Sequence, residues 1–134
     1  MKTIVEFLLF LICILPFMGC SGDEIEEDKE LVTSEYYVKY CYGGVTSNRA
    51  YHFSVQYTGV SNGSTKQFVS SYEGYASKIS DEKICGPFKY GDCVSLRMSG
   101  SLLNTFLEIY ISKDNSPFAL KKYGTEFIDY TIDY

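Results

Sequence analysis

Apolar and polar residues alternate with a period of two in five segments of the chain after residue 35. This period places every second side chain on the same face of an extended strand, so that one face of each segment is buried and the other meets solvent. The five segments span residues 36–42, 51–58, 93–98, 106–112 and 127–134. The residues predicted to face the core are Tyr36, Val38, Tyr40, Tyr42, Tyr51, Phe53, Val55, Tyr57, Val94, Leu96, Met98, Leu107, Ile109, Ile111, Ile128, Tyr130, Ile132 and Tyr134.

Turn-forming residues separate these segments. Residues 59–64 are predicted to form a hairpin loop, and residues 113–117 a polar turn. Residues 86–92 are predicted to connect two strands, because Pro87 cannot donate a hydrogen bond to a central ladder.

The stretch from Lys66 to Ile84 has a less regular pattern. Its spaced aromatic and aliphatic residues predict two short strands, because Gly74 and several serines lower helix propensity. A helical turn is predicted at residues 80–83, where Ser80 can act as the cap. Residues 118–123 are predicted to be a short strand or a link.

These segments define a fold class. The chain has 13 tyrosines and nine phenylalanines, which favour half-buried strands, and no helical pattern long enough to cover a parallel sheet. The sequence therefore predicts an all-β domain at residues 36–134, an antiparallel immunoglobulin-like β-sandwich of seven to eight short strands.

The N-terminal residues have the pattern of an export signal. Lys2 precedes an apolar run that is shorter than the roughly 20 residues of a membrane span, and the small residue Gly19 marks a cleavage point. A cysteine directly after Gly19 resembles the lipobox of bacterial lipoproteins, which implies that Cys20 is the first mature residue and carries lipid such as palmitate. Residues 1–19 are therefore interpreted as a lipoprotein signal peptide; ordinary secretion and a retained anchor are the alternatives.

Residues 20–35 are interpreted as an acidic, disordered tether. Residues 21–35 have a net charge of −6, whereas residues 36–134 have a net charge of +1, so the domain offers no basic stripe for nucleic acid. The acidic run after Cys20 resembles the surface-export signal of Bacteroidetes lipoproteins. This resemblance implies an outer-membrane lipoprotein at the cell surface, and a spacer on the periplasmic face is the alternative.

Residues 36–40, 86–91 and 107–118 resemble small, uncharacterised lipoproteins of gut Bacteroidetes. The strand pattern is also similar to that of mycobacterial MmpS-type accessory proteins, which have an immunoglobulin-like sandwich. Both resemblances imply a small exported domain that assists or decorates a larger envelope machine. Neither supplies a catalytic residue.

Three cysteines fall within the predicted domain, an odd number for an oxidising compartment. Cys85 and Cys93 flank the connection at residues 86–92 and are the favoured disulfide. Cys41 and Cys93 lie on the outward faces of their predicted strands and are the rival pair. Three unpaired thiols are the third alternative.

The residues offer little catalytic or metal chemistry. His52 is the single histidine and there is no Cys-x-x-Cys spacing, so the sequence predicts neither a metal site nor a cofactor. Cys41 and His52 would form a nucleophile pair if the first two strands were neighbours, but no third group is at hand to orient the histidine. The sequence therefore predicts a protein that is not an enzyme.

Outward-facing aromatic residues remain as candidates for function. Tyr37, Tyr110 and Phe127 occupy predicted solvent-facing positions, where rings stack on sugars, anchor protein interfaces or shield a sheet edge. The absence of tryptophan disfavours sugar stacking. The sequence thus predicts a lipid-anchored binding or accessory module that contacts an envelope or host protein. A glycan-binding lipoprotein of a polysaccharide-uptake system is the alternative.

Overall fold

A computed structural model of the chain describes residues 33–133. The predicted signal peptide (residues 1–19), the predicted lipidation site Cys20, residues 20–32 of the predicted tether and Tyr134 lie outside the described residues. One compact unit begins at Ser34. Among residues 33–133, no helix has the length and apolar character needed to cross a membrane.

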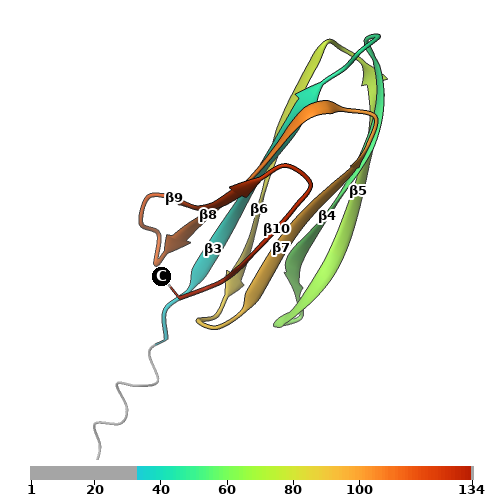
Figure 1. Cartoon of the computed structure of the whole chain (residues 1–134). Coiled ribbons are helices and arrows are strands. Elements are labelled where there is room, and N and C mark those ends of the chain that lie inside the picture. The colour runs from blue at the N-terminus through green and yellow to red at the C-terminus, as the bar shows by residue number, and fades with distance from the viewer. Residues whose placement is uncertain (1–32, 134) are drawn as a thin grey trace, which may run out of the picture. The chain divides into compact units, whose positions relative to one another are not determined.

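The described residues form eight strands arranged in two antiparallel sheets (Figure 1). The strands are β3 (Tyr36–Val45), β4 (Ala50–Ser61), β5 (Ser64–Tyr75), β6 (Lys78–Phe88), β7 (Cys93–Gly100), β8 (Leu103–Lys113), β9 (Ala119–Gly124) and β10 (Phe127–Thr131). Sheet 1 has the strand order β10-β7-β4-β5, and sheet 2 has the order β6-β3-β8-β9. The structure confirms the predicted all-β fold, an antiparallel β-sandwich.

The core lies between the two sheets and is built by the side chains that the alternation pattern places inward. Tyr40 and Tyr42 of β3 and Leu96 of β7 are fully buried, as are the inward residues of β8. Their burial supplies most of the driving force for folding, since each buried aliphatic or aromatic side chain contributes about 1.5–3 kcal/mol. The inward positions predicted for all five segments are buried or half-buried wherever the structure describes them.

The loop predicted at residues 59–64 is a tighter hairpin than expected. β4 and β5 pair up to Ser61 and Ser64, so the turn consists of Asn62 and Gly63 alone. Both residues have positive φ angles, 51° and 77°, which is the combination that a two-residue type I′ turn requires.

The stretch from Lys66 to Ile84 corrects two expectations. It belongs to two long strands, β5 and β6, instead of two short ones, and residues 80–83 are strand instead of a helical turn. Pairing with β3 along most of β6 outweighs the local preference of Ser80 for a helix cap.

Pro87 lies near the end of β6 instead of in a loop. This position is compatible with a proline because β6 is the edge strand of sheet 2, where an N–H can be missing without loss to a neighbouring strand. The peptide bond between Gly86 and Pro87 is cis.

Candidate functional site

Sheet 2 has aromatic and apolar side chains on its outer face as well as on its inner face. Tyr37 of β3 and Tyr110 of β8 both point outward, as the alternation pattern predicts. Three further apolar residues on this face are strongly exposed: Ile84 (55%), Leu120 (47%) and Tyr123 (75%). Their registers pair Ile84 with Lys39, Leu120 with Tyr110 and Tyr123 with Glu108. We call this surface, with Phe118, the aromatic face.

Lys39 lies at the centre of the aromatic face. Its Nζ atom is 4.9 Å from the ring centroid of Tyr110 and 5.1 Å from that of Phe118, so the ammonium group contacts two rings. The Tyr110 hydroxyl donates a hydrogen bond to Glu108 Oε1 at 3.0 Å, and this bond raises the pKa of the Tyr110 phenol. The face therefore combines rings with the Lys39 ammonium group and the Glu108 carboxylate.

A hollow of about 290 Å³ adjoins this cluster, with Tyr37, Ile84 and Phe118 as its apolar walls. Its polar side consists of Ser112, Asn115 and Ser116 from the end of β8 and the turn that follows. The Ser112 hydroxyl donates to the Ser116 carbonyl oxygen at 2.5 Å, which holds this turn against the sheet.

Tyr37 owes its position to Gly86. A Cβ atom on Gly86 would lie 2.7 Å from Cδ1 of Tyr37, and the φ angle of Gly86 is +149°, a value that favours glycine. The Tyr37 ring thus packs directly on the backbone of β6 at Gly86, and in this position the ring forms one wall of the hollow.

Phe127 does not belong to the aromatic face. It begins β10 in sheet 1, where it is exposed and pairs with Arg97, whose guanidinium carbon is 4.4 Å from the ring centroid. The structure therefore brings Tyr37 and Tyr110 onto one face and places Phe127 in the other sheet.

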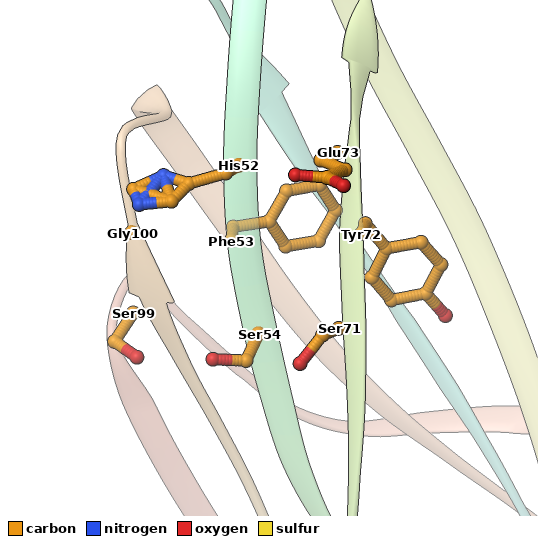
Figure 2. A pocket seen from close by; sticks show the side chains of 8 residues that line it. All are labelled: His52, Phe53, Ser54, Ser71, Tyr72, Glu73, Ser99 and Gly100. Atoms are coloured by element: carbon orange, nitrogen blue, oxygen red, sulfur yellow. The ribbon is translucent and has the colours of Figure 1, made fainter.

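A second concavity lies across β7, β4 and β5 of sheet 1 (Figure 2). Ser54 of β4 is in register with both Ser71 and Ser99, so three short side chains form a row across three strands. His52 and Glu73 are in register beside this row. Because their side chains are longer than those of the serines, a furrow of about 460 Å³ is left above the row. Besides these polar residues, the lining of the furrow includes the aromatic residues Phe53 and Tyr72.

The structure corrects the favoured disulfide. Cys85 lies in β6 of sheet 2 and Cys93 at the start of β7 in sheet 1, and both are free thiols, as is Cys41. The residues between Cys85 and Cys93 carry the chain from one sheet to the other, which separates two cysteines that are close in sequence. The rival pairing of Cys41 with Cys93 is also not formed.

Cys41 and His52 are not brought together. The strands that carry them, β3 and β4, belong to different sheets, and both residues are on the outward side of their own sheet. Burial raises the pKa of the Cys41 thiol, so the reactive thiolate is disfavoured. Among residues 33–133 there is no group of three or more histidine, cysteine or acidic residues that could hold a metal ion.

Sequence reasoning missed Lys39 and Phe118 as site residues. The sequence does indicate Lys39, because it lies two residues after Tyr37 in the same predicted strand and therefore on the same face. Phe118 gave no such signal, since it follows a turn and reaches Lys39 only through the pairing of β8 with β9.

Comparisons with known proteins found no relative of this chain. No protein-family model, no curated protein and no solved structure matches this chain.

Proposed function

We propose that this chain is an exported, lipid-anchored binding module without catalytic activity, and that it contacts a protein of the cell envelope or of a host through the aromatic face. The observation that carries this proposal is the set of exposed apolar side chains on the outer face of sheet 2, namely Ile84, Leu120 and Tyr123 around the rings of Tyr37 and Tyr110. Antiparallel sheets that meet water on one face normally present polar residues there. Contiguous apolar groups on such a face typically mark an interaction site.

The composition of the face suits a protein ligand. Tyrosine and phenylalanine provide large contact areas that lose little side-chain entropy on binding, and such residues often dominate the free energy of association. The Lys39 ammonium group is already held between the rings of Tyr110 and Phe118, so it adds an oriented charge without further ordering.

The Tyr110→Ala and Phe118→Ala substitutions are expected to reduce recovery of the partner by about tenfold or more, because each removes a ring of the kind that supplies binding hot spots. The measurement is chemical crosslinking on living cells, followed by pull-down of a tagged full chain and quantitative mass spectrometry of one dominant membrane-associated partner. Phe127→Ala is the matched control, since it removes an exposed ring from the other sheet.

Equal recovery with Tyr110→Ala and with Phe127→Ala would exclude the aromatic face as the contact surface. A wild-type chain that captures no protein would instead favour the glycan-binding alternative. That alternative is supported by the hollow beside Tyr37, which has aromatic walls and a polar side formed by residues such as Asn115. A glycan array probed with the full chain and with Asn115→Ala would then be the next measurement.

The proposed anchoring can be tested separately. Cys20→Ser is expected to abolish incorporation of a labelled palmitate analogue into the protein in cells, since no other residue is predicted to receive the lipid. Cys13→Ser is the matched control and is expected to retain the label, because Cys13 lies within the predicted signal peptide. Undiminished labelling of Cys20→Ser would contradict the lipoprotein assignment, whatever the aromatic face binds.

A further inference from the structure

The first half of β5 is exposed along one edge and on both of its faces. β5 is an edge strand of sheet 1 and pairs only with β4 (Figure 1). Residues 64–69 are all exposed, including the apolar residues Phe68 (36%) and Val69 (65%). Phe68 is in register with Tyr57 and therefore points to the side of sheet 1 that meets sheet 2. A large apolar residue on that side is thus left uncovered.

Sheet 2 has no strand opposite Phe68. β6 is the edge strand of that sheet and packs across from β4. β5 is the next strand beyond β4, and its exposed first half extends past the edge of sheet 2, whereas Tyr72 in its second half contacts Tyr42 of β3. A strand added to the free edge of β6 would lie beneath β5 and would bury Phe68. Pro87 limits such pairing to the part of β6 that precedes it.

A hollow of about 320 Å³ lies at this position, lined by apolar and aromatic groups from both sheets. The ring of Phe68 rests directly on the backbone of Gly59, because a Cβ atom there would be only 2.8 Å from the ring. Tyr57, Ile84 and Cys85 complete the apolar lining. Its size and chemistry suit one bulky apolar side chain.

Two lysines and one aspartate lie beside this groove and give it a net charge of +1. Lys66 is in register with Gly59 and Lys83 with the buried Tyr40, so both point toward the space between the two edges. Asp81 is in register with the buried Tyr42 and points to the same side of β6, one inward position beyond Lys83. The Lys83 Nζ atom is 5.6 Å from the ring centroid of Tyr57. Within residues 33–133 neither lysine forms an ion pair, and no carboxylate lines the hollow. An occupant with acidic residues would complement this charge.

We propose that the groove between β5 and β6 receives an extended segment of a partner protein, which pairs as a strand with the free edge of β6. A bulky apolar residue of the segment fills the hollow, and acidic residues on the same face of the segment lie beside Lys66 and Lys83. In this mode of recognition, main-chain hydrogen bonds supply affinity and the pocket supplies specificity. The groove shares only Tyr37 and Ile84 with the aromatic face. The proposal does not depend on the partner of that face.

The probe for this groove is a blocked seven-residue peptide that reads threonine, aspartate, threonine, phenylalanine, threonine, aspartate, threonine. Titrated into the full chain by calorimetry, it is expected to bind saturably with a dissociation constant below about 1 mM. Lys66→Glu and Phe68→Ser are expected to weaken binding by about tenfold or more, because they reverse a groove charge and remove the floor of the hollow. Both residues are exposed, so neither change removes a core side chain. Lys122→Glu, on the opposite edge strand β9, is the matched control and is expected to bind as the wild type does.

Three outcomes would overturn the proposal. Absence of saturable binding at several times 1 mM would exclude a peptide site of useful affinity. Equal binding of a peptide with methylated backbone nitrogens would exclude strand pairing, because such a peptide cannot donate main-chain hydrogen bonds. A concentration-dependent dimer of the full chain that Lys66→Glu abolishes and the peptide does not disrupt would assign the groove to a second copy of this chain.

Discussion

Replacing Leu96 with alanine is expected to lower the free energy of unfolding by about 2–5 kcal/mol. Leu96 is fully buried in β7, in register with Ile128 on one side and Tyr57 on the other. The truncation removes apolar contact and leaves a cavity that the two neighbouring strands close only in part. For a domain of this size, about 1 kcal/mol shifts the melting temperature by about 4–8 °C, so a decrease of at least about 8 °C is expected.

Thermal unfolding followed by circular dichroism provides the measurement. Leu103→Ala is the matched control, because it makes the same chemical change at a residue that is half exposed, and a shift of no more than a few degrees is expected there. An unchanged melting temperature for Leu96→Ala would mean that this face of β7 does not meet the core.

Alkaline conditions are expected to unfold the domain through two buried tyrosines. The Tyr40 hydroxyl donates to the Thr58 carbonyl oxygen at 2.6 Å, and the Tyr42 hydroxyl lies 2.6 Å from that of Tyr72. Burial raises the pKa of both phenols above the ordinary value near 10. Above that pH the unfolded chain loses these protons while the folded domain keeps them. Stability is therefore lost as pH rises above about 10, by up to about 1.4 kcal/mol per pH unit for each tyrosine.

Urea unfolding at a series of pH values from about 8 to 11 would measure this slope. Tyr40→Phe is expected to be less stable at neutral pH, because the buried Thr58 carbonyl loses its donor, but to show a shallower alkaline decline. Tyr75→Phe is the control: Tyr75 is strongly exposed, so the slope of the wild type is expected. An identical slope for Tyr40→Phe would show that its ionisation does not control alkaline unfolding.

For individual residues of the candidate site, the sequence predicts whether the side chain faces outward. The alternation pattern placed Tyr37, Tyr110 and Phe127 on outward faces, and the structure agrees for all three. It did not reveal that the first two share a sheet while Phe127 lies in the other. Residues 66–84 were harder to predict, because β5 is exposed on both faces along its first half and so lacks the alternation that marks a half-buried strand.

The sequence by itself determined which side chains enter the core and where several turns fall. The period-two pattern of residues such as Tyr40 and Leu96 predicts burial because it follows from the geometry of a single strand. Only the tertiary structure decided which strands are neighbours, since the ladder is formed by backbone groups that are alike at nearly every residue. For that reason Cys41 and His52 lie in different sheets, and Lys39 reaches Phe118. The groove beneath β5 also exists only because sheet 1 extends past the edge of sheet 2.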